Sequence, residues 1–285
     1  MQLTDPERST ELLWRAGARR GLSLERIVRA AVELADAEDL AAVSMRSLAE
    51  RLGFTTMALY RHVRGKAELV ALMRDEVMGG WDSAADPSAA GGWRAELEAW
   101  ARRGLALHQR HPWLAESEDA RHVPGPNAVA VFERALGAVA DTGLPPAQVV
   151  AAVNLLGGFV DSAARQSAAA LRARRRTGVS DEEWWRGRDS LFARLDRYPT
   201  LSRLYREGAY EAPPDPFDFG LQRVLDGIDT LIRDEKRDEN VCRVCGAPVS
   251  AATSGRPRDY CSRACQQRAY RARKGGGGSG GGPRP

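Results

Sequence analysis

The sequence predicts an all-α protein made of a short N-terminal domain, a larger helical domain and a small cysteine-bearing tail. Three observations support this fold class. Residues 44–66 have the pattern of two short helices joined by a tight turn. Between residues 93 and 236, apolar side chains recur at three- and four-residue spacing, prolines separate the segments, and no run alternates convincingly as a strand would. The four cysteines form two close pairs after residue 241.

Residues 1–21 are expected to form a flexible N-terminal arm. The stretch from Glu11 to Gly21 is short, basic and interrupted by glycine, which disfavours a helix. Residues 1–10 are polar and carry acids, so they lack the pattern of a signal peptide. No window reaches the apolar length of a membrane-spanning helix. The sequence therefore predicts a cytoplasmic protein without a membrane partner.

Residues 44–66 predict a helix-turn-helix within a domain expected over residues 22–80. Ser44 can cap the first helix, and Gly53 supplies the backbone freedom that its end requires. Thr55 or Thr56 can cap the second helix, whose outer face is polar. Such a short helix can enter a DNA major groove, where its side chains meet base edges and phosphates. An ordinary helical hairpin on a solvated surface is the alternative.

The distribution of charge fits a DNA-binding role for this segment. Residues 1–80 carry 12 basic and 12 acidic side chains, but residues 41–66 carry four arginines and one lysine against Glu50 alone. A local excess of this kind is what attraction to phosphates requires, although solvated surface charges explain it too. The preceding helix, expected from Leu24 to Ala37, has an apolar stripe that can pack behind the motif. The basic arm can reach a minor groove or remain an unbound tether.

The motif resembles the signature of the TetR family of bacterial transcriptional repressors. The matching positions are Gly53, Phe54, Leu59, Tyr60, His62, Val63, Gly65, Lys66 and Leu69. The resemblance implies that Tyr60, His62 and Lys66 contact the phosphate backbone of an operator and that residues 55–58 and Arg61 supply base contacts. The candidate DNA-contacting residues are Ser44, Arg46, Thr55, Thr56, Met57, Ala58, Tyr60, Arg61, His62 and Lys66. Side chains in the middle of this helix form few strong hydrogen bonds, so the operator sequence is not predicted.

A connecting helix is expected from Gly65 to Met78, with Glu68 placed to return a hydrogen bond to its start. Gly79-Gly80 then breaks the pattern and predicts a domain boundary. The helices expected beyond it cover residues 93–109, 126–142, 146–175, 181–197 and 216–236. The helix from Pro146 is too apolar for a helix exposed on one side.

Residues 93–236 are expected to form a helical regulatory and dimerisation domain, and they resemble the tetracycline-repressor type of C-terminal domain. The resemblance implies that the 146–175 and 216–236 helices pair with their symmetry mates in a four-helix dimer interface. It also implies that a ligand bound inside the domain moves the connecting helix. We expect Leu225 and Ile228 to lie in the interface. A bundle that folds on itself is the alternative.

The candidate residues for a ligand pocket are large or polar side chains on apolar helices. They are Trp100, His108, His111, Trp113, His122, Asn127, Asn154, Phe159 and Gln166. Asn154 is the most specific candidate, because an amide between Val153 and Leu155 destabilises the fold unless a hydrogen-bond partner satisfies it. Each of these residues can equally be a satisfied core or surface residue. The magnesium–tetracycline ligands of the family cannot be placed here, so the small-molecule inducer stays unidentified.

The cysteines predict a zinc-binding module over residues 240–274, followed by a Gly-rich flexible tail over residues 275–285. Fifteen residues separate the pair Cys242 and Cys245 from the pair Cys261 and Cys265. Two such pairs in a cytosolic protein favour four thiolates around one zinc ion, and a dithiol redox switch is the alternative. The pairs resemble small treble-clef or zinc-ribbon modules. Residues 255–257 (Gly-Arg-Pro) resemble the core of an AT-hook.

Taken together, these patterns predict a dimeric DNA-binding regulator, a repressor released from its operator by a small-molecule inducer. The expected partners are operator DNA, a second copy of the chain and the inducer. Zinc is the expected cofactor, and the protein would associate with the bacterial nucleoid. The alternative is a metal- or redox-sensing regulator controlled through the four cysteines. An enzyme has little support, because the chain has four histidines and no paired-carboxylate, phosphate-loop or nucleophile motif in context.

Overall fold

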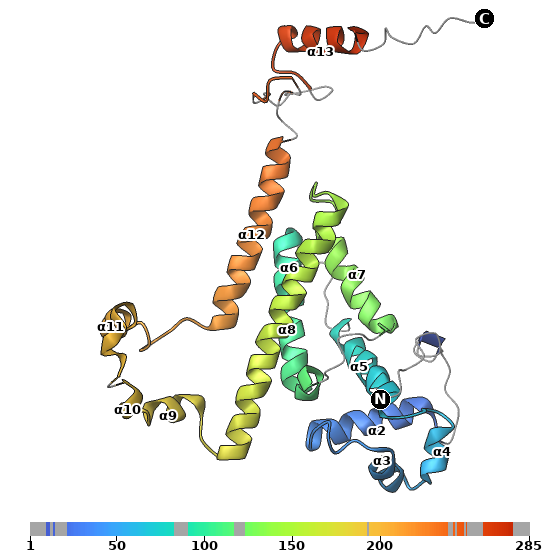
Figure 1. The fold of residues 1–285 in the computed structure, drawn as a ribbon. Coiled ribbons are helices and arrows are strands. Elements are labelled where there is room, and N and C mark those ends of the chain that lie inside the picture. Colours follow the sequence, from blue (N-terminus) through green and yellow to red (C-terminus); the bar gives the residue numbers. More distant parts are fainter. Residues whose placement is uncertain are drawn as a thin grey trace, which may run out of the picture.

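The computed structural model of the chain describes Thr10, Glu11, Trp14, residues 22–82, 91–116, 123–192 and 194–238, Cys242, residues 244–247, Val249 and residues 259–275. Every regular element within these residues is helical, which confirms the all-α fold class (Figure 1). The α-helices are α2 (Leu24–Ala37), α3 (Met45–Leu52), α4 (Thr56–Tyr60), α5 (Lys66–Asp82), α6 (Gly92–Arg110), α7 (Pro126–Ala140), α8 (Pro146–Thr177), α9 (Asp181–Arg186), α10 (Asp189–Phe192), α11 (Pro199–Arg206), α12 (Pro216–Asp238) and α13 (Arg263–Gly275). Two 3-10 helices, η1 (Pro112–Glu116) and η2 (Leu195–Arg197), complete the set. The arm and the Gly-rich tail lie almost entirely outside the described residues.

Helices α2, α3 and α4 form the N-terminal bundle at one end of the molecule (Figure 1). The apolar stripe expected on α2 is buried, with Ile27 and Ala31 fully inside. Leu48 of α3 and Leu59 of α4 are fully buried in the same core. This shared core fixes α4 on α3 and leaves the opposite side of both helices to solvent.

The helix ends of this bundle follow the expected capping pattern. The Ser44 side chain accepts a hydrogen bond from the backbone N–H of Ser47, and Gly53 ends α3 in the left-handed conformation with φ of 74°. Thr55, rather than its neighbour, caps α4 by accepting from the backbone N–H of Ala58. The turn between α3 and α4 is therefore fixed by local hydrogen bonds, as the sequence predicted.

Helix α5 continues to Asp82, so the prediction that Gly79-Gly80 ends it is wrong. Packing overrides the low helix propensity of glycine here. Trp81 is buried over Gly104 of α6, where a Cβ would lie 2.7 Å from the indole ring. A Cβ at Gly79 would lie 3.2 Å from the amide nitrogen of Asn127, so glycine lets α7 approach.

The single helix expected over residues 181–197 is divided into α9, α10 and η2. The Gly187 N–H donates to the carbonyls of Glu183 and Trp185 and ends α9 after six residues. The described side chains of α9 and α10 are all exposed. A single long helix over these residues would have no buried face and no tertiary packing to stabilise it, which explains the breaks.

Helix α8 corrects the expectation that no window has the apolar length of a membrane helix. It spans 32 residues and holds an 18-residue window with a mean hydropathy of 1.3, enough to cross a bilayer by length and composition alone. The core helix of a water-soluble protein passes the same test. α8 packs on α6, α7 and α12, yet only 33% of that window is buried within the chain. Much of α8 is therefore exposed on the surface of the protomer.

Candidate nucleic-acid interface and metal site

The ten candidate DNA-contacting residues come together on α3, on α4 and in the turn that follows α4. Exposed among them are Ser44, Arg46, Thr55, Thr56, Met57, Tyr60, Arg61 and Lys66, and half-buried are Ala58 and His62. Met57 is an apolar side chain among them, yet 68% of its surface is exposed. Leu59 and Val63 are fully buried behind it, so α4 is held from one side only. We call these ten residues the recognition surface.

Two basic side chains of the recognition surface already have polar partners. The Arg46 Nε donates to Glu50 at 3.0 Å, and the Lys66 Nζ donates to the carbonyl oxygen of Leu40 at 2.6 Å. The Lys66 ammonium has three N–H donors, so this bond leaves donors for a phosphate. Glu68 accepts from the backbone N–H of Arg64 at 2.6 Å, which is the hydrogen bond expected at the start of α5.

Several of the candidate pocket residues make structural hydrogen bonds instead of lining the groove described below. The Trp100 Nε1 donates to the carbonyl of Val131 at 3.0 Å and ties α6 to α7, whereas the His108 Nδ1 lies 2.9 Å from the carbonyl of Gly104 within α6 itself. Asn154 is exposed on α8, so the expectation that it is a buried amide needing a partner is wrong. His122 lies outside the described residues.

A groove of about 390 Å³ runs between α6, α8 and the start of α12. Its lining comprises Leu105, Gln109, Phe159, Ser162, Ala163, Gln166, Ser167, Asp215, Pro216 and Phe217. Phe159 and Gln166 are the two sequence candidates that line it. Phe159 stacks on Phe217 with ring centroids 5.4 Å apart, and a Cβ at Gly220 would lie 2.5 Å from its ring. Apolar rings with a few amides and hydroxyls suit a small organic molecule. We call this the regulatory groove.

The C-terminal end of α6 is joined to the N-terminal bundle by one carboxylate. Asp36 of α2 accepts hydrogen bonds from the His111 Nδ1 and the Trp113 Nε1, both at 2.8 Å. Trp113 is 1% exposed. His111 and Trp113 were pocket candidates from the sequence, but they connect the two domains instead. Nothing in the sequence around Asp36 marks it as their partner.

A second polar contact ties α5 to the start of α7. The buried Asp75 side chain accepts from the backbone N–H of Ala128 at 2.9 Å, and the Asn127 side-chain amide donates to the Asp75 carbonyl at 2.9 Å. Burial raises the pKa of the Asp75 carboxyl, and the backbone N–H groups of Ala128 and Asn127 partly oppose this. A Cβ at Gly125 would collide with this carboxyl group. The position of α5 is thus coupled to α7 as well as to α6.

Helices α8 and α12 present exposed small and apolar side chains, which we call the α8–α12 stripe. On α8 these are Ala147, Val150, Ala151, Asn154, Leu155 and Gly158, and on α12 they are Phe219, Gly227 and Leu231. Leu155 is 58% exposed. Leu225 and Ile228, by contrast, are fully buried within the protomer. The expectation that these two residues form an intersubunit surface is therefore wrong, since they face α6 and α8 of their own chain.

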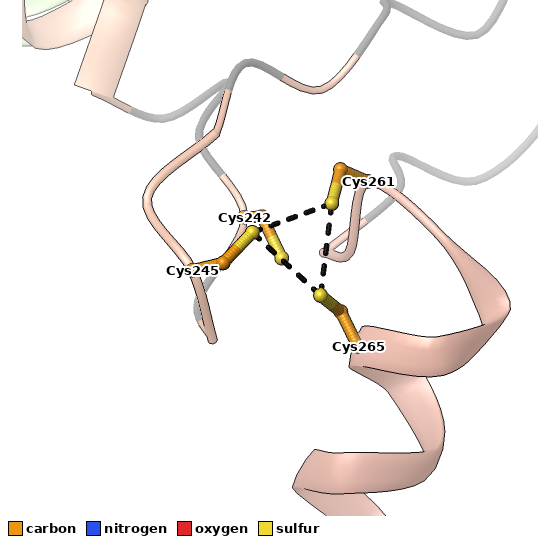
Figure 2. A group of neighbouring side chains, drawn as sticks. All are labelled: Cys242, Cys245, Cys261 and Cys265. Atoms are coloured by element: carbon orange, nitrogen blue, oxygen red, sulfur yellow. Dashed lines mark hydrogen bonds between the residues drawn. The ribbon is translucent and has the colours of Figure 1, made fainter.

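The four cysteines converge on one point in the tail (Figure 2). Their sulfur atoms all lie within 4.8 Å of one another, with 3.4 Å from Cys245 to Cys261 and 3.6 Å from Cys245 to Cys265. All four are free thiols. This set of four sulfur ligands matches the tetrahedral donor set that structural zinc prefers. We call it the cysteine cluster.

Hydrogen bonding divides the charge unequally within the cysteine cluster. Burial opposes ionisation of Cys242, but the backbone N–H groups of Cys261, Val244 and Cys245 outweigh it and lower the pKa of Cys242 to about 6. Contacts with the sulfur atoms of Cys245, Cys242 and Cys265 raise the pKa of Cys261 to about 12. The Cys242 thiolate therefore forms readily and the Cys261 thiolate does not, and a cation among the sulfurs would favour the ionised form of Cys261.

Comparison with known proteins decides the family. Residues 27–73 match the family described as bacterial regulatory proteins, tetR family, and residues 87–232 match the tetracyclin repressor-like C-terminal domain. The chain belongs to the TetR family. The HTH-type transcriptional repressor DrrR1 of Streptomyces coeruleorubidus is 42% identical to this TetR protein over 245 residues, covering 83% of this chain and 90% of the relative. This TetR protein is a DNA-binding transcriptional repressor and not an enzyme, as the sequence predicted.

Solved structures agree with this membership. The transcriptional regulator SCO7222, a TetR from Streptomyces coelicolor, is 31% identical with a TM-score of 0.59, covering 75% of this chain and 100% of that one. The S. coelicolor TetR family protein ActR in complex with actinorhodin is 25% identical with a TM-score of 0.62, covering 74% and 97%. The matched C-terminal domain ends at residue 232, before the first cysteine.

Proposed function

We propose that this TetR protein is a homodimeric repressor that leaves its operator when a small molecule binds in the regulatory groove. The observation that carries the proposal is the pair of hydrogen bonds from His111 and Trp113 to Asp36. Leu105 and Gln109 line the groove on α6, and His111 follows Gln109 by two residues. A ligand that displaces this last turn of α6 would pull on α2 and hence on the recognition surface.

The groove has a size and lining suited to such a ligand. Its volume of about 390 Å³ falls in the range of small-molecule sites. ActR, which has a related fold, has been solved with actinorhodin, so a relative holds a small organic molecule. The hydrogen bonds to Asp36 connect the N-terminal bundle to the end of α6, the helix that lines the groove. They do not involve the cysteine cluster. We therefore favour release by an organic ligand over control by metal or redox state.

We further propose that the α8–α12 stripe forms the dimer interface and that the cysteine cluster holds one zinc ion. An exposed apolar stripe costs free energy unless a partner covers it, and operators read by helix-turn-helix dimers are two-fold symmetric. Four sulfurs on short loops bind zinc better than the harder cations. A repressor with these properties works in the cytoplasm, where its DNA lies.

Replacing Arg61 by Ala should weaken operator binding by roughly 1–3 kcal/mol, about 5- to 150-fold, if its guanidinium reads a base. The operator would be selected from random duplexes with wild-type protein, and affinities measured by fluorescence anisotropy. Arg206→Ala removes an exposed arginine from α11, outside the N-terminal bundle, and serves as the control. Equal operator affinity for wild type and the Arg61 variant would remove Arg61 from the recognition surface.

Changing the groove should impair release without changing operator binding. Molecules that raise the melting temperature of the protein would be collected from a small-molecule library, with actinorhodin included, and tested for release of the selected operator. We expect Phe159→Ala and Gln166→Leu to raise the concentration needed for release at least about tenfold, because each removes a lining group. Release that is unchanged in both variants would contradict the assignment of the groove.

A further inference from the structure

The cysteine cluster positions a helix whose exposed face is basic. Cys265 is buried on one side of α13, with Ala269 half-buried beside it. Arg263, Gln267 and Arg271 follow at four-residue spacing on the opposite side, where all three are exposed. Arg268, also exposed, flanks this row. A metal that fixes Cys265 would therefore hold this row of side chains toward solvent.

Charge on this segment is unbalanced. Residues 240–285 carry nine basic side chains and one acidic one, Asp259, and none of the residues after it is acidic. Zinc bound to four thiolates adds a net charge of −2, so the segment falls from +8 to +6 and stays strongly basic. Arginine and glutamine are side chains that hydrogen-bond phosphates and purine edges, and a single helix fits a major groove. This chemistry suits a DNA duplex.

The contacts of α12, the helix that precedes the tail, show where α13 lies relative to the recognition surface. α12 runs antiparallel to α6, because Arg102 bonds Asp218 at 2.6 Å and Arg94 bonds Asp226 at 2.7 Å. His111 at the other end of α6 touches α2. With a rise of 1.5 Å per residue, the end of α12 lies roughly 40 Å from His111 along the helix axes.

The segment between α12 and the cysteine cluster is too short to bring α13 back to the recognition surface. Cys242 follows Asp238 by four residues, a reach of about 14 Å at most. Figure 1 shows the same arrangement, with α3 and α4 at one end of the molecule and α13 at the other. An operator bound by α4 lies beyond α2, on the side away from α12. The exposed face of α13 therefore lies away from the operator segment held by α4.

We propose that the cysteine cluster and α13 form a second DNA-binding element, which binds a duplex other than the operator segment held by α4. The repressor would thereby bridge two DNA segments. This inference rests on the proposed zinc site and on the repressor function. Its contacts are phosphate contacts with Arg263, Arg268 and Arg271, so binding is largely independent of sequence and sensitive to salt.

A bridging assay with full-length protein tests the proposal. Operator duplex on beads would be saturated with zinc-loaded repressor at low ionic strength and washed, and a fluorescent duplex without operator would then be added. We expect wild type to retain the second duplex. The triple variant R263Q/R268Q/R271Q should retain at least about tenfold less, with a salt dependence shallower by about one unit of slope per lost contact.

Three further measurements make the result specific. The control R197Q/R203Q/R206Q removes three exposed arginines from η2 and α11 and should bridge like wild type. Operator affinity of the R263Q/R268Q/R271Q variant should stay within about twofold of wild type, since α13 lies away from the operator. Unlabelled duplex should compete for the second site far better than polyglutamate.

The opposite outcomes overturn the proposal. Equal bridging by wild type and the R263Q/R268Q/R271Q variant, or no bridging by zinc-loaded wild type, would show that α13 does not bind a second duplex. If the R263Q/R268Q/R271Q variant lost operator affinity and wild type did not bridge, α13 would bind the operator itself. Equal competition by polyglutamate would indicate an acidic protein as the partner. Operator retention and zinc content are measured separately, so failure of the repressor function or of the metal site is recognised as such.

Discussion

Val150→Asp and Leu155→Asp are each expected to turn the dimer into folded monomers that bind the operator at least about 100-fold more weakly. Both side chains are exposed in the protomer, Val150 at 43% and Leu155 at 58%, so neither change disturbs the core of the chain. A carboxylate there would be buried without a partner when two copies meet across the α8–α12 stripe. Loss of the second recognition surface removes the gain from two linked half-sites.

A matched control separates this effect from a general effect of the substitution. Val129 lies on α7 and is 39% exposed, so Val129→Asp makes the same chemical change at similar exposure outside the stripe. We expect that variant to stay dimeric in sedimentation experiments and to bind the operator normally. Circular dichroism would show that all three variants keep their helices. A dimeric Val150→Asp or Leu155→Asp protein would show that another surface joins the subunits.

Val150 and Leu155 are not the interface positions that the sequence predicted, and the difference shows what the sequence could predict about the proposed dimer interface. The three- and four-residue spacing over residues 216–236 correctly identified an apolar stripe on α12. It did not distinguish the core of the protomer from an intersubunit surface. Leu225 and Ile228 have the stronger hydrophobic pattern and are buried against their own chain. The exposed positions are smaller and more scattered. Periodicity indicates that one face of a helix is buried. Only the fold shows whether the same chain or a second subunit covers that face.

The DNA-binding end of the molecule was predicted more completely than the regulatory domain. Ser44, Gly53 and Thr55 act through local hydrogen bonds and backbone conformation, which residue type and spacing encode directly. The pocket candidates depended on contacts between distant helices. Asp36 meets His111 across 75 positions of the chain, and no local pattern reports such a pair.

The predicted end of α5 at Met78 was wrong for a related reason. Gly79-Gly80 is a strong local signal for a break, and tertiary packing of Trp81 over Gly104 reverses it. A second close approach, of α7 to α5, places Asn127 beside Gly79. Glycines that end a helix and glycines that admit a neighbouring helix look alike in sequence.

The double variant Cys242→Ser, Cys245→Ser is expected to lose the one zinc ion that we propose for each chain and, with it, the order of α13 and of the residues packed on the cysteine cluster. The core of this segment comprises Cys242, Val249 and Cys265 with Val244 and Tyr260 packed against them. So few apolar side chains cannot offset the entropy of ordering the segment, and metal binding would supply the missing free energy. Inductively coupled plasma mass spectrometry of purified protein should give one zinc per wild-type chain and none for the variant.

Proton release gives an independent measurement of the same site. Zinc binds thiolates, and the pKa of about 12 for Cys261 means that this thiol still carries its proton at neutral pH. The pKa of about 6 for Cys242 means that its thiolate is already largely formed there. Zinc binding must therefore displace the Cys261 proton, and calorimetry in buffers of different ionisation enthalpy should detect it. Zinc affinity should fall as the pH is lowered, and more steeply below about 6, because Cys242 is then protonated as well.

Ser262→Ala is the control, since it changes a side chain beside the cluster and keeps all four sulfurs. We expect it to retain one zinc per chain. The folded core should be indifferent to all of these changes, because α12 is held by Leu221, Leu225 and Ile228 before the cysteines begin. Wild-type protein that is free of metal and still protects residues 242–275 from proteolysis, or freshly isolated protein with a disulfide between the pairs, would show that zinc does not organise the tail.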